Sequence, residues 1–559
     1  MAEEQASETL RYFFSPEQPL GSVSAREEVA EEFRLVFRTY FDRENFPIQQ
    51  LRRNPTMIIG RKGAGKTDAL MSYSFGLSPT GRNGQYLPIY FDSKGASRLF
   101  TTIIVQVSDA VRQNAPPPMV EAIADLWDRL FWISILVRIA HETIDEDILE
   151  MGTLRQFAHS LGIRTDRVPD PYNVVLDALV SLLHIYAESR EKIVGIDFFS
   201  AIPTIMRDHL DLENAKLIAT NWLRNNNSQA IILFDSIESI NINEFNNDLV
   251  LSGLLKAIGA FEQPGLPVQF RCCIPSEIFH YLLISSSNAL KDFQRAHTLH
   301  WHAGELLKIA ARRYQKFIEL WSPDNINALV SPYSLTHRSS GIDFWTAILP
   351  DTVPNAFSGS FERTIPYILR HTQLLPRHLL LILNKIISRS ISEESSVTPS
   401  ISPQIIVEEV WKSEELIRGQ IFDSYKALWP QARDSLEHVL PSLGKNVVSY
   451  GDMHRTFNRS AARSLGFDDF RHFIRMLSEL GVIGRFVGKT DRYTRAVFEY
   501  SEPSRLIFTS DDFLCIHPLF SSAYRVTHPQ FPRGDFLPVY PLGTDPDELD
   551  RRREQSLNF

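Results

Sequence analysis

Short apolar runs alternate with longer segments of helical periodicity along the first 300 residues of the chain. Strands are predicted at 56–59, 86–91, 229–234, 268–274 and 298–301. Helical spacing of apolar residues predicts helices at 27–41, over much of 97–223, and at 249–261. Continuous apolar runs are typical of parallel strands buried on both faces. The alternation therefore predicts an α/β fold with a parallel sheet and a large helical insertion between two of its strands.

The second half of the chain has a different pattern. It is predicted to be helical from Glu305 to about Ile391, and a Ser- and Pro-rich linker follows at 392–403. Three helical segments are then expected near 429–443, 450–465 and 468–480, with strands at 494–500 and 513–516. Helices followed by a β-hairpin favour a winged helix-turn-helix. After Tyr524 the chain is rich in proline and charge, and we expect it to lie over the surface or fray.

These patterns predict five regions. An N-terminal helical segment covers 1–50, and an α/β core covers 51–304 with its helical insertion at about 97–223. A helical lid follows at 305–391 and a winged-helix domain at 404–526. Residues 527–559 form a C-terminal tail.

Composition narrows the class of protein. Of the 559 residues, 43% are hydrophobic and 22% charged, which excludes global disorder. The formal charge of −9 argues against a surface covered entirely by nucleic acid, although a local basic face remains open. Three cysteines make neither a disulfide framework nor a zinc pattern and fit a reducing cytosol. The N-terminus is acidic and lacks the apolar stretch of a signal peptide, and no run of 18 apolar residues occurs. Both features predict a cytoplasmic protein with no membrane partner.

The strongest chemical signal is the eight-residue string Gly60-Arg61-Lys62-Gly63-Ala64-Gly65-Lys66-Thr67. It fits the P-loop pattern G-x-x-x-x-G-K-[ST], between a predicted strand and a predicted helix. Such a loop turns its backbone N–H groups onto a triphosphate, the lysine contacts the β and γ oxygens, and the threonine hydroxyl ligates Mg²⁺. The alternative is a glycine-rich strand-to-helix turn with no ligand. The pattern predicts ATP and Mg²⁺ as cofactors, with all eight residues at the nucleotide: Gly60, Arg61, Lys62, Gly63, Ala64, Gly65, Lys66 and Thr67.

Besides the Thr67 hydroxyl, the metal needs a carboxylate ligand. Asp235 directly follows the apolar run 231–234. This is the Walker B position, so Thr67 and Asp235 are the predicted metal ligands. The alternative for Asp235 is a helix N-cap. Glu238 is the candidate general base, and a solvated surface glutamate is an equal alternative. Lys66, Asp235 and Glu238 are thus the candidate catalytic residues of this region.

The order of these motifs resembles the bacterial single-chain P-loop ATPases of the AAA+/STAND superfamily, which are related to the ATPase modules of origin-recognition proteins. The resemblance spans roughly residues 20–525. The segment Leu374–Leu380 resembles the start of the sensor 2 helix of that group, which implies that Arg377 contacts the γ-phosphate and couples a lid to the nucleotide. The sequence departs from the family pattern at Ser236, where many members have an acid.

The predicted winged helix is locally basic. DNA contact through its third helix and wing is one interpretation, and a protein-contact or autoinhibitory module is the other. The basic residues are Arg455, Arg459, Arg463, Arg471, Arg475, Arg485, Lys489, Arg492 and Arg495.

The leading hypothesis is a Mg-ATP-binding and ATP-hydrolysing switch that controls conformation or self-association. The resemblance extends this to bacterial signalling or phage defence. The alternative is an ATP-dependent DNA-binding regulator or loader that uses the winged helix. Elsewhere, the adjacent Cys272 and Cys273 are interpreted as core residues of a strand.

Overall fold

The computed structural model describes residues 2–23, 56–74, 85–112, 120–145, 149–189, 198–209, 211–235, 245–261, 263, 265–279, 295–325, 340–355, 360–467, 469–502, 505–526 and 537–557. The predicted helix at 27–41 lies outside them. The chain divides into two units. Unit 1 comprises Met1–Pro47, Lys62–Gly65 and Leu299–Phe559, and unit 2 comprises Ile48–Arg61 and Lys66–Thr298.

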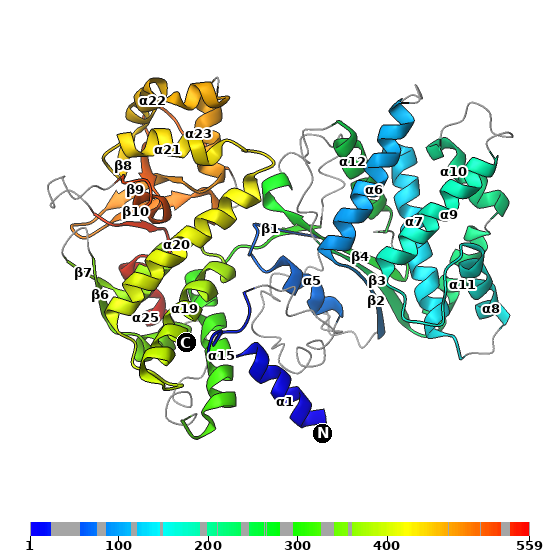
Figure 1. The fold of residues 1–559 in the computed structure, drawn as a ribbon, viewed down its shortest axis with the longest axis horizontal. Helices are drawn as coiled ribbons and strands as arrows, with labels where there is room; N and C mark the ends of the chain where they lie inside the picture. The colour runs from blue at the N-terminus through cyan, green and yellow to red at the C-terminus, as the bar shows by residue number, and fades with distance from the viewer. Residues whose placement is uncertain are drawn as a thin grey trace. The chain divides into compact units, whose positions relative to one another are not determined.

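Unit 2 is built on a five-stranded sheet in which every pairing is parallel (Figure 1). Its order is β2-β3-β4-β1-β5. Every residue of β1 is buried, as expected for strands covered on both faces. The predicted parallel α/β sheet is confirmed, although the last strand begins two residues earlier than expected and ends at Thr298. The strands are β1 (Met57–Gly60), β2 (Gln85–Phe91), β3 (Ser228–Phe234), β4 (Val268–Pro275) and β5 (Ala296–Thr298).

The predicted insertion between β2 and β3 is helical, and its helix α7 is at the centre of the core of unit 2. Trp127 and Phe131 of α7 stack with ring centroids 5.5 Å apart, and Phe131 also contacts Phe234 of β3 and Phe270 of β4. These aromatic contacts join helix to sheet. No helix in the described part of the chain is long and apolar enough to cross a membrane. The helices of unit 2 include α5 (Lys66–Ser74), α6 (Ser93–Arg112), α7 (Val120–Glu142), α8 (Leu149–Ser160), α9 (Pro171–Ser189), α10 (Phe198–His209), α11 (Leu212–Asn225) and α12 (Phe245–Ala260).

The described residues of unit 1 before residue 400 are mainly helical, as predicted, and among them one β-hairpin is an exception. A β-hairpin of β6 (Thr352–Pro354) and β7 (Phe361–Arg363) interrupts the helices. These strands are only three residues long, too short for periodicity to reveal. The helices are α1 (Ala2–Phe13), α15 (Ala303–Trp321), α17 (Ser340–Ile348), α18 (Thr364–Arg370) and α19 (Pro376–Glu394).

The predicted linker at 392–403 is shorter in the structure. Helix α19 continues to Glu394, and helix α20 (Pro403–Tyr425) begins at the last linker residue, with Ser402 as its N-cap. Pro403 fits the first turn of α20, where no backbone N–H is needed. A proline interpreted as a linker residue therefore begins a 23-residue helix that the sequence pattern did not predict.

The last part of unit 1 contains the three predicted helices and a second five-stranded sheet of order β12-β10-β9-β11-β8. Strand β11 occupies its predicted position, and β10 begins where predicted but ends two residues earlier, at Phe498. Strands β8, β9 and β12 were not predicted. The helices are α21 (Ala432–Val439), α22 (Tyr450–Arg459) and α23 (Phe470–Glu479), followed by the short α24 (Pro518–Ser521). The strands are β8 (Val447–Ser449), β9 (Ile483–Lys489), β10 (Thr494–Phe498), β11 (Phe513–Ile516) and β12 (Val539–Pro541).

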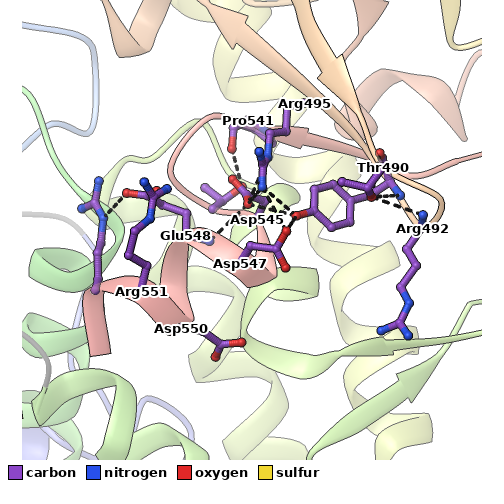
Figure 2. Close-up of polar contacts among 12 residues, drawn as sticks. Thr490, Arg492, Arg495, Pro541, Asp545, Asp547, Glu548, Asp550 and Arg551 are labelled. Carbon is purple, nitrogen blue, oxygen red and sulfur yellow. Dashed lines mark hydrogen bonds and ion pairs between the residues drawn. The ribbon is translucent and has the colours of Figure 1, made fainter. Parts of the chain in front are cut away.

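We expected the C-terminal segment to lie over the surface or fray, but its described residues 537–557 form a strand and a helix. Strand β12 pairs in parallel with β10, and helix α25 (Pro546–Leu557) follows it. Tyr540 and Leu549 are buried. Figure 2 shows the acidic start of α25 beside β10, where Arg495 donates to Asp545 at 2.9 Å. Buried apolar side chains and this ion pair hold the segment in place.

We predict that Phe131→Ala will lower the free energy of unfolding by about 3–5 kcal/mol, because it removes a fully buried ring from the aromatic cluster. Urea unfolding followed by circular dichroism measures the change. The control is Val180→Ala on α9, which is 56% exposed and should cost less than about 0.5 kcal/mol. A decrease below about 1 kcal/mol for Phe131→Ala would contradict the packing of α7 against the sheet.

Candidate functional site

The parallel sheet of unit 2 places the ends of its strands at one edge. Strand β1 ends at Gly60, β3 ends at Phe234 and β4 ends at Pro275. In open parallel sheets, ligands bind outside the carboxyl ends of the strands. The residues that directly follow β1 and β3 therefore meet at the edge where a ligand is expected.

Lys66 and Thr67 begin helix α5 at this edge. The Lys66 ammonium is buried and donates to the carbonyl oxygens of Gly60 at 2.9 Å and Arg61 at 3.2 Å. These two bonds hold the side chain across the start of the loop. Backbone N–H groups in the first turn of a helix have no intrahelical partner, so the start of α5 also favours negative charge.

Asp235 directly follows β3 and is 1% exposed. The Thr67 hydroxyl lies 3.2 Å from one of its carboxylate oxygens and 3.1 Å from the other. The Tyr90 hydroxyl of β2 donates to the same carboxylate at 3.4 Å. Burial and the charge of Asp235 raise the pKa of Tyr90, so the phenol keeps its proton and acts as a donor.

Cys273 of β4 also contacts Lys66. Its thiol donates to the backbone oxygen of Lys66 at 3.3 Å. Burial, and then the charge of Asp235, raise the pKa of this thiol, so it stays protonated and unreactive. Cys272 and Cys273 are both buried, which confirms their interpretation as core residues.

The middle of the loop, Lys62–Gly65, belongs to unit 1. Gly63 and Gly65 adopt φ angles of +90° and +84°, a region that glycine enters without strain. The backbone N–H of Arg377, at the start of α19, donates to the Gly63 oxygen at 3.4 Å. Trp301 donates its indole N–H to the Ala64 oxygen at 2.8 Å. Two residues of unit 1 therefore border this part of the loop.

The structure brings together Gly60, Lys66, Thr67 and Asp235 within unit 2, and Gly63 with Arg377 within unit 1. Glu238 lies outside the described residues. Arg61 and Lys62 are half-buried loop residues. Three further neighbours were not predicted from the sequence: Tyr90, Cys273 and Trp301. Tyr90 and Cys273 had a usable signal, because each lies near the end of a predicted strand that reaches the same edge of the sheet.

No family model matches the chain, and no curated protein matches it. Among solved structures, the Aeropyrum pernix ORC2 protein in ADPNP–ADP complexes is similar at 12% identity and a TM-score of 0.38, covering 92% of this chain and 94% of that chain. The ADP form of the same protein is similar at 12% identity and a TM-score of 0.31, over 86% of this chain and 90% of that one. Cdc6p from Pyrobaculum aerophilum has 10% identity and a TM-score of 0.25, over 92% and 96%. These likenesses by themselves assign no function.

We predict that Gly63→Ala will destabilise unit 1 more than Gly466→Ala. Both glycines have positive φ, +90° and +96°, so an added Cβ costs each about 1–2 kcal/mol. At Gly63 the new Cβ would also lie 3.0 Å from the Arg377 Cβ, whereas at Gly466 its nearest neighbour is 3.8 Å away. Urea unfolding of the two variants measures the difference, and equal destabilisation would show that the loop does not pack against Arg377.

Proposed function

We propose that the chain binds Mg-ATP and hydrolyses it, and that the nucleotide state controls its conformation or self-association. The observation that carries this proposal is the contact of the Thr67 hydroxyl with both oxygens of the buried Asp235, next to Lys66 at the start of α5. A glycine-rich turn without a ligand would not require a buried carboxylate beside it. Burying a carboxylate is costly unless it is paired or binds a cation.

The loop residues supply the phosphate contacts. Lys66 exchanges its two carbonyl acceptors for the β and γ oxygens of ATP, a stronger pairing because the acceptor is charged. The left-handed glycines leave the loop without side chains at the positions of closest approach. The positive end of the α5 helix dipole lies at Lys66 and also favours the negative charge of the phosphates. We propose the whole string, residues 60–67, as the phosphate-binding segment.

Thr67 and Asp235 fit a magnesium ion. A hydroxyl and a carboxylate are the hard oxygen ligands that Mg²⁺ prefers, and Mg²⁺ retains water and phosphate oxygens in its other positions. When bound, the ion neutralises charge on the β and γ phosphates. Tyr90 orients the Asp235 carboxylate through its hydrogen bond. Glu238 remains our candidate base for hydrolysis on its position in the sequence.

Arg377 is the proposed sensing residue. Its backbone N–H contacts Gly63, and its guanidinium Nε donates to the Val23 oxygen at 3.2 Å. A phosphate group that attracts the Arg377 guanidinium would break its hydrogen bond to Val23. This change would shift the start of α19 and release its contact with the N-terminal segment. We propose this exchange as the link between nucleotide and conformation.

Lys66→Ala should weaken ATP binding by about tenfold to a hundredfold, because it removes a charged hydrogen-bond donor. Isothermal titration with ATP and Mg²⁺ measures the affinity. ATP at 100 times its Kd should stabilise the unaltered protein by about 2.7 kcal/mol in thermal unfolding, and the variant should lose this gain. Thr67→Ala should reduce the dependence of binding on Mg²⁺.

The control is Lys256→Ala, whose ion pair with Glu121 lies on the surface of unit 2 and should leave ATP binding unchanged. Unchanged ATP affinity in Lys66→Ala would refute the proposal. A turnover assay measures hydrolysis, and mass photometry with and without ATP measures self-association.

A second candidate function is DNA binding by the C-terminal part of unit 1. Helices α21, α22 and α23 with the hairpin β9–β10 have the element order of a winged helix. Four of the nine basic residues are neutralised by carboxylates, for example Arg475 by Glu479 and Arg495 by Asp545. The other five form no ion pair among the described residues and are exposed: Arg459, Arg463, Arg471, Lys489 and Arg492. Figure 2 shows the Arg492 side chain directed away from Asp545 and Asp547.

If this part binds DNA, the double variant Arg471→Gln/Arg492→Gln should weaken binding uniformly across sequences. The slope of log affinity against log salt should fall by about 0.9 for each phosphate that the protein no longer neutralises. Fluorescence anisotropy with duplex DNA at several salt concentrations measures both effects. Arg455→Gln is the control, because Arg455 already pairs with Asp452 on the surface. Binding that is absent or independent of salt would leave only the protein-contact interpretation.

A further inference from the structure

Trp301 contacts the glycine-rich loop through its indole nitrogen. The indole N–H donates to the Ala64 oxygen at 2.8 Å. Trp301 is 7% exposed and Ala64 is 1% exposed, so this hydrogen bond is shielded from water. Both residues belong to unit 1, together with the rest of Lys62–Gly65. The hydrogen bond therefore fixes the direction of the Ala64 carbonyl within one unit.

The direction of this carbonyl determines the direction of the next N–H. A trans peptide unit is planar, so the C=O of Ala64 and the N–H of Gly65 point in opposite directions. Because Trp301 holds the oxygen from one side, the Gly65 N–H is directed to the other side of the loop. Gly63 and Gly65 have positive φ angles of +90° and +84°, on either side of Ala64. Successive N–H groups in a loop with left-handed residues of this kind form a concave site for an anion.

The backbone of Trp301 is itself fixed by the start of helix α15. The next residue, His302, is the N-cap of α15, and its N–H donates to the Glu305 carboxylate at 3.1 Å. At the start of α19, the Arg377 N–H donates to the Gly63 oxygen at 3.4 Å. The first residues of α15 and α19 thus hold two successive carbonyl oxygens of the loop, and the bond from Trp301 is the shorter one.

We propose that Trp301 is a positioning residue, which holds the Ala64 oxygen and thereby directs the Gly65 N–H toward the phosphates of ATP. This inference rests on the proposed binding of ATP by the same loop. Trp301 does not touch the nucleotide. Without the indole donor, the peptide unit between Ala64 and Gly65 can rotate, and the loop must be ordered when the phosphates bind. The hydrogen bond therefore raises ATP affinity by preorganising the loop.

The test compares two substitutions of Trp301 in the full-length chain. Trp301→Phe keeps an aromatic ring and loses the donor, whereas Trp301→His has a smaller ring and keeps a donor. The imidazole Nε2 lies at the same place in its five-membered ring as the indole Nε1, and it can carry a proton. At about pH 8 the imidazole is neutral, so it adds no charge beside the phosphates. Isothermal titration with ATP and Mg²⁺ should show about three- to tenfold weaker binding for Trp301→Phe and at most about a twofold change for Trp301→His.

Thermal unfolding without ATP separates this role from simple packing. Trp301→Phe should be the more stable of the two variants, because phenylalanine fills a buried apolar space better than a polar imidazole does. The order of stability should therefore be opposite to the order of ATP affinity. ATP affinity that follows the order of stability, or that Trp301→Phe leaves unchanged, would overturn the positioning role.

The matched control is Trp345→Phe in the same unit. The Trp345 indole donates to the Leu307 oxygen of α15 at 3.0 Å, so this variant loses the same kind of hydrogen bond. It should keep its ATP affinity, and an equal loss in both Phe variants would also overturn the positioning role. All these outcomes leave ATP binding itself intact. If the unaltered protein did not bind ATP, the proposed function and this inference would both be wrong.

Discussion

The parallel pairing of the five strands in unit 2 is the constraint on which the rest of that unit depends. Parallel neighbours cannot be joined by a tight turn, so each connection needs a crossover, and helices α6 to α11 form the one between β2 and β3. The crossovers cover the sheet and bury its apolar strands. The same constraint places the ends of β1 and β3 at one edge. Thr67 and Asp235, which are 168 positions apart in the chain, therefore come within hydrogen-bond distance.

In unit 1 the buried carboxylate of Glu362 joins segments that are far apart in the sequence, as the parallel sheet does in unit 2. Glu362 accepts two hydrogen bonds from Arg370 at 2.9 Å and further ones from Tyr540 and Asn355 at 2.5 Å. Burial by itself would raise the pKa of Glu362, but Arg370 and the Tyr540 hydroxyl lower it below its usual value. The charge is thus retained and fully paired. Because Tyr540 belongs to β12, this network ties the C-terminal segment to the β6–β7 hairpin.

The sequence predicted the helices and strands that have a clear pattern of apolar residues within their own segment. The strands β1 to β4 were predicted because each is a nearly continuous apolar run, and the helical character of the insertion was predicted because apolar residues recur there at helical spacing. Strand β9 was not, because it contains Gly484 and Gly488. The structure explains the first of these: a Cβ at Gly484 would lie 2.7 Å from the Val497 oxygen of the paired strand. Helix α20 was missed because Pro403, at its first position, was interpreted as part of a linker.

The sequence by itself determined the glycine-rich string at residues 60–67, its position between a strand and a helix, and the acid, Asp235, that directly follows the apolar strand β3. Those features depend on the backbone preferences of glycine and on the periodicity of neighbouring residues, both of which are local. Only the tertiary structure decided that Tyr90 and Cys273 border the same site and that Arg495 is neutralised by Asp545. These outcomes depend on which distant segments are buried against one another, and burial determines whether a charge or a donor finds a partner.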